Sequence, residues 1–185
     1  VNYETIMYEA YAPGSVAMLI ECLTDNRNRA VSDVRVAVTR NGATMADGGS
    51  VQRLFERKGV VTVSKTFEVT EGRKTTTHEV DEDQLMEATL EAEPEDIVDL
   101  GEAFEIICDP NAIVDVRKAI QAAGIDYDSA EVEFRAGFAQ PVELEDARKI
   151  AKITELLEDL DDVQNVYTNA DITPELAAAL EEDED

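Results

Sequence analysis

Residues Val16 to Arg29 read Val-Ala-Met-Leu-Ile-Glu-Cys-Leu-Thr-Asp-Asn-Arg-Asn-Arg, and they contain the first junction between a strand and a helix. The apolar run that opens this stretch is typical of a β-strand. Asp25 or Asn26 can cap the next helix, because a short side-chain acceptor satisfies the free amide groups of the first turn. Apolar residues then recur at helical spacing from Ala30 to Val38. The chain is therefore expected to pass from a strand directly into an amphipathic helix.

The pattern continues on both sides of this junction. Residues 3–11 alternate loosely and are followed by the turn-forming residues Ala-Pro-Gly-Ser, so the chain should open with a β-hairpin. Further strands are expected at 59–63, 104–108, 130–136 and 163–168, and helices at 81–92, 112–123 and 144–160. In the second half the order is β-α-β and then α-β, which predicts an antiparallel sheet with both helices on one face.

The fold class predicted from these elements is α+β. We expect two ferredoxin-like α/β-sandwich subdomains, at residues 1–100 and 101–170, followed by a short helix and an acidic tail at 171–185. The first half has an irregular number of strands. An exchange of elements between the two subdomains therefore stays open as an alternative.

The charge of the chain is uneven. The formal net charge is −26 over 185 residues, and 44% of the residues are hydrophobic, which is ordinary for a folded protein. Residues 1–80 hold ten basic and ten acidic side chains, whereas residues 81–185 hold six and 32. Two halves with such different electrostatic surfaces are expected to meet different partners.

Positive charge gathers between Asn26 and Lys58, where seven basic residues stand against three acidic ones. On a helical wheel, Arg29 and Arg40 lie opposite the apolar face of the helix. Arginine offers paired donors to a phosphate, and the amide groups at a helix start also favour an anion. The candidate nucleic-acid-binding residues are Asn26, Arg27, Asn28, Arg29, Arg35, Arg40, Arg53, Arg57 and Lys58. The alternative is a solvated helix face with an Arg29–Asp33 ion pair.

Two further residue types have alternatives that stay open. Tyrosines 3, 8 and 11 could stack on nucleic-acid bases, or they could pack on a face of the sheet. Cys22 and Cys108 lie in apolar runs and are expected to be buried, reduced thiols. A single disulfide is the other possibility, but no cysteine–histidine cluster suggests a zinc site.

The sequence gives little support for catalysis. His78 is the single histidine, and no glycine-rich phosphate-binding motif is present. The acidic runs lack the pattern of a calcium loop. We therefore predict a non-enzymatic protein with no cofactor, no metal and no small-molecule substrate. Without a signal peptide or an apolar run of membrane-spanning length, a cytoplasmic protein with no membrane contact is expected.

Four segments carry a family resemblance. They are Tyr8–Gly14 (Tyr-Glu-Ala-Tyr-Ala-Pro-Gly), Leu23–Arg29, Gly49–Val60 and Leu157–Tyr167. In these segments the chain resembles the YebC/PmpR family of probable transcriptional regulatory proteins, which is related to the mitochondrial translational activator of cytochrome c oxidase subunit I. The resemblance implies a cytoplasmic bacterial protein of three domains. The first of these is basic and all-helical, and Val1 of this chain lies at the first strand of the second.

The leading functional hypothesis is a DNA-binding regulator of transcription without catalytic activity. The alternative is a translation factor that binds ribosomal RNA on the ribosome and helps translation through difficult stretches such as proline runs. A third possibility is a protein-interaction module that uses the acidic half and the tail. The oligomeric state is left open.

Overall fold

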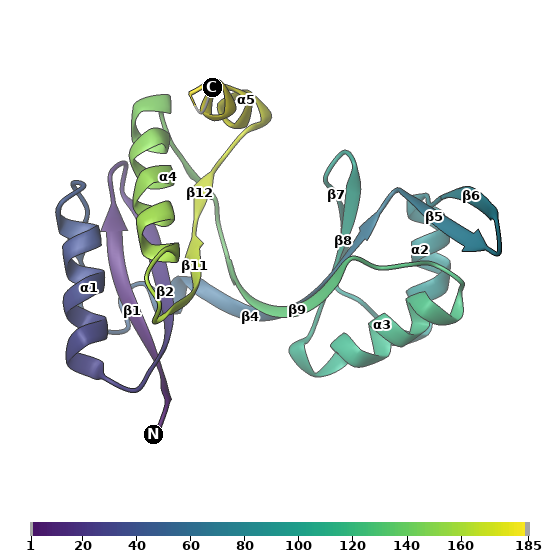
Figure 1. Cartoon of the computed structure of the whole chain (residues 1–185), viewed down its shortest axis with the longest axis horizontal. Coiled ribbons are helices and arrows are strands. Elements are labelled where there is room, and N and C mark those ends of the chain that lie inside the picture. The colour runs from purple at the N-terminus through teal and green to yellow at the C-terminus, as the bar shows by residue number, and fades with distance from the viewer. Residues whose placement is uncertain (1, 184–185) are drawn as a thin grey trace. The chain divides into compact units, whose positions relative to one another are not determined.

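The hairpin expected at the start of the chain is present in the computed structural model, which describes residues 2–183 (Figure 1). β1 (Glu4–Ala12) pairs antiparallel with β2 (Val16–Thr24), and Ala12 faces Val16 across the last pair before the turn. Gly14 and Ser15 close the turn with φ of 84° and 62°. Glycine adopts this left-handed conformation without steric strain, so the Pro-Gly-Ser sequence suits the turn.

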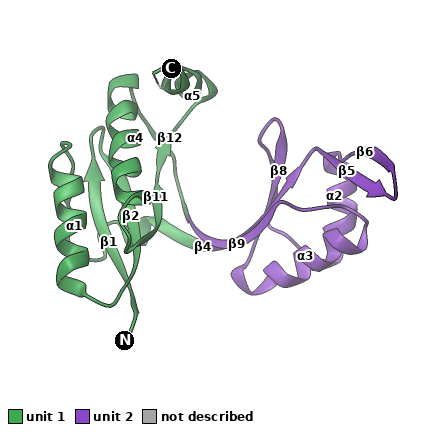
Figure 2. Ribbon diagram, viewed as in Figure 1, with its two compact units in different colours: residues 1–56, 135–185 green, residues 57–134 purple. Residues whose placement is uncertain are grey.

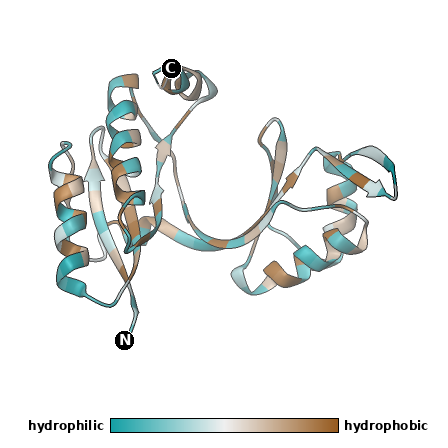
Figure 3. Ribbon diagram, in the orientation of Figure 1, coloured by the Kyte–Doolittle hydropathy of each residue, from teal (hydrophilic) through white to brown (hydrophobic). Residues whose placement is uncertain are grey.

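Two strands from later in the sequence extend the hairpin into a sheet of order β11-β2-β1-β3. β3 (Thr44–Met45) pairs with β1, and β11 (Val163–Thr168) pairs with β2. The helices α1 (Arg27–Thr39) and α4 (Leu144–Glu158) pack on one face of this sheet. Figure 3 shows hydrophobic and hydrophilic residues alternating along both helices, as helical periodicity predicts. The buried side chains between helices and sheet include Ala10, Met18, Ile20, Val34, Val38, Ile150, Ile153 and Leu157.

Shorter elements complete this part of the chain. β10 (Gln140–Pro141) and β12 (Ala170–Asp171) form a two-stranded parallel pair. α5 (Pro174–Glu182) begins with Pro at its first position and is capped by Thr173, whose Oγ1 accepts a hydrogen bond from the Leu176 amide. The short helix expected before the acidic tail is therefore α5.

A second sheet has the order β7-β8-β4-β9. Its strands are β4 (Phe55–Ser64), β7 (Asp96–Asp99), β8 (Ala103–Cys108) and β9 (Ser129–Ala136). β8 lies between β4 and β7, and β4 lies between β8 and β9. Two split β-α-β units therefore interlock, which is the ferredoxin-like arrangement.

The helices of this second sheet are α2 (Glu82–Thr89) and α3 (Ile113–Ala122). Asp81 and Gln84 form a capping box at the start of α2. The hairpin of β5 (Thr66–Glu71) and β6 (Lys74–Glu79) is inserted between β4 and α2. The buried core of this part consists of Val61, Val63, Val80, Leu85, Phe104, Ile106, Cys108, Val116, Ile120 and Ile125.

Gly59 allows α3 to begin close to β4. A Cβ atom at this position would lie 2.8 Å from Cys108 Sγ and 3.0 Å from Ile113 Cβ. Cys108 and Cys22 are both free and buried, as predicted, and burial raises the pKa of the Cys22 thiol to about 11. Both thiols are therefore protonated at neutral pH.

The chain forms two compact units with bounds that differ from the expected ones (Figure 2). One consists of Val1–Glu56 with Arg135–Asp185, and the other of Arg57–Phe134. The boundary expected at residue 100 falls inside the second unit, because β7 and β8 pair across it. Likewise α3 and α4, expected on one sheet, belong to different units. The first unit is completed by strands and helices that follow the second unit in the sequence, so the second unit is inserted between two segments of the first.

Candidate nucleic-acid interface

The strand-to-helix junction has the cap that its sequence predicts. Asn26 is the N-cap of α1, and its Oδ1 accepts a hydrogen bond of 3.1 Å from the Arg29 amide. The Asn26 amide in turn donates to Thr24 Oγ1 at 3.0 Å. This geometry fixes the first turn of α1 directly after β2. The backbone positions of the exposed residues in this turn are therefore fixed.

Arg29 is held by two carboxylates. Its Nε and Nη2 donate to the two oxygens of Asp162 at 3.1 and 2.9 Å, and Nη2 also donates to Asp25 at 2.8 Å. These hydrogen bonds raise the pKa of the Arg29 guanidinium, and the bonds from Arg29 lower the pKa of the Asp162 carboxyl. Asp162 is only 8% exposed and lies just before β11. Arg29 therefore ties the start of α1 to the start of β11, in place of the Asp33 pair considered from the sequence.

Two other candidate cations also have acidic partners. Arg27 binds Glu4 through two hydrogen bonds of 2.8 and 3.1 Å, with both side chains largely exposed. Lys58 Nζ lies 2.7 Å from Glu95 Oε2. The exposed Arg27–Glu4 pair contributes little to stability, so little free energy opposes its replacement by another anion. A phosphate would therefore compete with Glu4 for Arg27 more easily than with the buried Asp162 for Arg29.

The exposed side of α1 carries the remaining helical candidates. Asn28 and Arg35 lie seven residues apart, which places them on one stripe of the helix. Arg40 caps the C-terminal end of α1 and lines a hollow of about 290 Å³ between α1 and α4, together with half-exposed Val36. Within residues 2–183, neither Arg35 nor Arg40 forms an ion pair. These two guanidinium groups are thus the ones that α1 offers to solvent.

The last three candidates fall outside α1. Arg53 is exposed in the first unit, and its Nε donates to the Ser50 carbonyl at 3.3 Å. Arg57 and Lys58 lie in β4 at the start of the second unit. The structure thus brings Asn26, Arg27, Asn28, Arg29, Arg35 and Arg40 together on one helix and its cap, whereas Arg57 and Lys58 belong to the other unit.

The three tyrosines considered from the sequence differ in their exposure. Tyr8 is half-buried and packs against the core of the first unit, and burial raises its pKa. Tyr3 and Tyr11 are 64% and 37% exposed. Tyr8 therefore has a packing role, and the other two present part of their rings to solvent.

Glu9 is a residue that the sequence reasoning missed. It is 5% exposed, and its carboxylate accepts hydrogen bonds from the amides of Gly49, Val51 and Gln52 at 2.6 to 2.8 Å. These contacts hold the loop and the short 3₁₀ helix Gln52–Leu54, which carries Arg53. The signal in the sequence was a single carboxylate within the otherwise uncharged run from Thr5 to Ile20, with a Gly-Gly pair further on.

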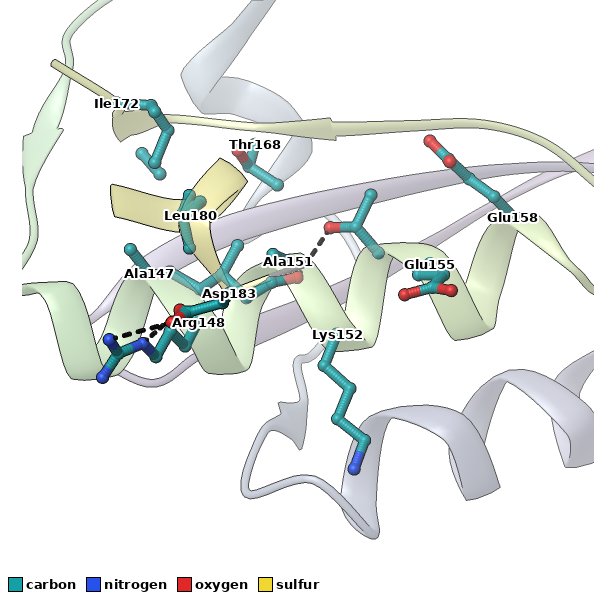
Figure 4. Close-up of a pocket in the computed structure, with 13 residues that line it drawn as sticks. Ala147, Arg148, Ala151, Lys152, Glu155, Glu158, Thr168, Ile172, Leu180 and Asp183 are labelled. Carbon is teal, nitrogen blue, oxygen red and sulfur yellow. Dashed lines mark hydrogen bonds and ion pairs between the residues drawn. The ribbon is translucent and has the colours of Figure 1, made fainter. Parts of the chain in front are cut away.

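A further hollow lies in the first unit, beside α4, β12 and α5 (Figure 4). It measures about 970 Å³ and is lined by aliphatic and charged side chains in nearly equal number, with two threonines. Arg148 and Asp183 form an ion pair at its rim, and Thr154 bonds to the carbonyl of its own helix. In the described part of the chain no group of three or more His, Cys, Asp or Glu residues is placed to hold a metal ion. No helix there is long and apolar enough to cross a membrane.

The protein is thus a two-unit α+β protein in which six of the nine candidate contact residues lie on one helix and its caps. Residues 3–170 match the family described as the second and third domain of TACO1/YebC, and the chain belongs to this family. Its relatives are named as regulatory proteins.

A probable transcriptional regulatory protein of Cutibacterium acnes is 78% identical over 184 residues, covering 100% of this chain and 70% of the relative. One from Mycobacterium tuberculosis is 54% identical over 182 residues, covering 98% and 68%. The crystal structure of a conserved hypothetical protein, Aq1575 from Aquifex aeolicus, superposes with a TM-score of 0.77 at 33% identity. That match covers 91% of this chain and 65% of the other, so the chain spans less than two thirds of that protein.

Proposed function

We propose that the chain is the non-enzymatic part of a cytoplasmic, DNA-binding regulator of transcription, with the exposed side of α1 as its contact with the phosphate backbone. The observation that carries the proposal is that Arg35 and Arg40, on the two flanks of the exposed side of α1, are exposed guanidinium groups without acidic partners in residues 2–183. The names of the relatives support the same class of function.

The distribution of charge limits how this contact can work. Arginine binds phosphate with paired donors, and neutralising phosphates releases counterions from DNA. Arg27 can join once Glu4 is displaced, whereas Arg29 stays with Asp162. A few contacts on a chain of net charge −26 give weak binding at physiological salt. We therefore propose that α1 helps to position the protein on DNA. Most of the affinity for DNA would come from the basic helical domain that the family resemblance implies.

The test is binding to duplex DNA at several salt concentrations, by fluorescence anisotropy, for this chain alone and for the chain joined to that basic helical domain. The proposal predicts affinity that falls with salt, and a further fall on replacing Arg35 and Arg40 together with glutamate. The matched control replaces Arg73 and Lys74, at the β5-β6 turn, by glutamate and has the same net charge.

Absence of any salt-dependent affinity in both proteins would refute the proposal. Equal losses in the two charge-reversed variants would refute the assignment to α1. If ribosomal RNA were bound in preference to duplex DNA, the chain would be assigned to translation instead.

A further inference from the structure

One segment of the second unit has an extreme charge. Residues 79–116 contain fourteen acidic side chains and neither lysine nor arginine. The segment includes α2, β7, β8 and the start of α3. Acidic residues on a surface are usually just solvated, so by themselves they do not indicate a binding site. At α2 the segment surrounds exposed apolar side chains.

A hollow of about 440 Å³ opens between α2, the turn that follows it and the start of β7. Its apolar side chains are Met86, Leu90, Pro94 and Ile97. Met86 and Leu90 lie one helical turn apart and are 53% and 73% exposed. Adjacent, exposed apolar side chains around a hollow usually mark a surface that binds a partner.

Carboxylates rim this hollow. Glu82, Glu93, Glu95 and Asp96 line it, and Lys58 lies 2.7 Å from Glu95. In residues 2–183, no lysine or arginine pairs with the other three. The hollow thus combines an apolar floor with a negative rim, in which Glu95 pairs with Lys58 and the other three carboxylates have no cationic partner in residues 2–183.

We propose that this hollow docks a basic amphipathic helix of a protein partner. Two apolar side chains of the partner, three or four residues apart, would cover Met86 and Leu90, and its lysines or arginines would pair with the rim. This goes beyond the DNA contact proposed for α1, because it lies in the other unit and takes a partner of opposite charge.

Charge complementarity favours one of three possible ligands for this hollow. Nucleic acid is repelled by the rim, because both carry negative charge. A second copy of this chain in a symmetric dimer would bring two identical acidic rims together. A cationic helix with an apolar face can pack on the apolar floor and pair its positive charges with the acidic rim.

The experiment uses the whole chain and a synthetic helical peptide of alanine and lysine, with two leucines four residues apart on one face. Binding is measured by fluorescence anisotropy at low and moderate salt. A peptide of identical composition, with its leucines on opposite faces, controls for non-specific attraction to an acidic protein. Circular dichroism confirms that each variant is folded.

We expect Leu90→Ser to weaken the affinity for the amphipathic peptide about tenfold or more. The control is Leu100→Ser, at a 55% exposed leucine outside the hollow, which should leave this affinity unchanged. Replacing the rim by Glu82→Gln with Glu93→Asn should weaken binding and reduce its salt dependence. Asparagine is chosen because position 93 has φ of 49°. The charge-matched control is Glu68→Gln with Glu71→Gln in the β5-β6 hairpin.

Three results would overturn the proposal. The first is no measurable binding, or equal binding of both peptides. The second is an equal effect of the hollow variants and their controls. The third is a concentration-dependent dimer, seen by analytical ultracentrifugation, that Leu90→Ser abolishes, because that result would assign the hollow to a second copy of the chain.

Discussion

Replacing Arg29 by alanine should destabilise the first unit, although Arg29 looks like a surface residue of α1. The substitution removes two hydrogen bonds to Asp162 and one to Asp25. It also leaves the Asp162 carboxylate, 8% exposed, without its cation. Arg27→Ala is the matched control. It removes a two-bond pair with Glu4 from the same helical turn, but both of those side chains are largely exposed.

The expected magnitudes follow from this difference in burial. Hydrogen bonds to charged groups contribute about 1.5–3 kcal/mol when buried, and an exposed ion pair contributes about 0–1 kcal/mol. The side chain of Asp162 is only 10% exposed, whereas that of Arg29 is 46% exposed and partly screened by solvent, so Arg29→Ala should lose less than this buried value but clearly more than Arg27→Ala. For Arg27→Ala the loss should be close to zero, because both partners are largely exposed.

The assay is urea unfolding followed by circular dichroism, because the chain contains no tryptophan. A fall of about 4–8 °C in the melting temperature of Arg29→Ala is also expected. A double-mutant cycle of Arg29→Ala with Asp162→Ala should give a coupling energy of about 1 kcal/mol or more. If the two arginine variants differ from each other by less than about 0.5 kcal/mol, the reasoning about the buried partner is wrong.

Three further predictions concern pH and packing. Hydrogen bonds from Arg29 lower the pKa of Asp162, so the stabilisation is complete above about pH 5 and is lost as pH falls through the lowered pKa. The difference in free energy of unfolding between the native chain and Arg29→Ala should therefore shrink below about pH 4. Glu9→Gln places an amide donor against backbone amides that now donate to a carboxylate, and should cost about 1–3 kcal/mol in urea unfolding. Gly59→Ala should cost about 1–3 kcal/mol because its Cβ overlaps the core, whereas Gly137→Ala, with a nearest atom at 3.9 Å, should be neutral by thermal unfolding.

The local elements of this fold are readable from the sequence, because they depend on periodicity and caps. The strand Val163–Thr168 was predicted with the bounds that the structure has, and Gly124, with φ of 76°, lies just beyond the end of α3. The division into units was not predictable in this way. α3 and α4 have similar amphipathic patterns, and nothing in their periodicity says which sheet each one covers. That depends on long-range pairing of β4 with β8 and of β2 with β11.

The candidate site shows the same limit. The composition identified the basic region. Of the two residues predicted to cap α1, Asp25 and Asn26, it is Asn26 that forms the N-cap. The acidic partners of the arginines in this region lie far away in the sequence, at Glu4 and Asp162. The helical wheel placed Arg29 on an exposed face, but it could not reveal a carboxylate 133 residues further on. Among the arginines of α1 and its caps, Arg35 and Arg40 are the two without an acidic partner in residues 2–183.

The salt dependence of duplex DNA binding tests this account most directly. The logarithm of the affinity is plotted against the logarithm of salt concentration for the chain joined to a basic helical domain. Comparison is made with Arg35→Gln and Arg40→Gln together, and with Arg73→Gln and Lys74→Gln together. The account predicts that the slope becomes shallower by about 1 for each α1 arginine removed, and stays unchanged in the control. Identical slopes in all three proteins would contradict it.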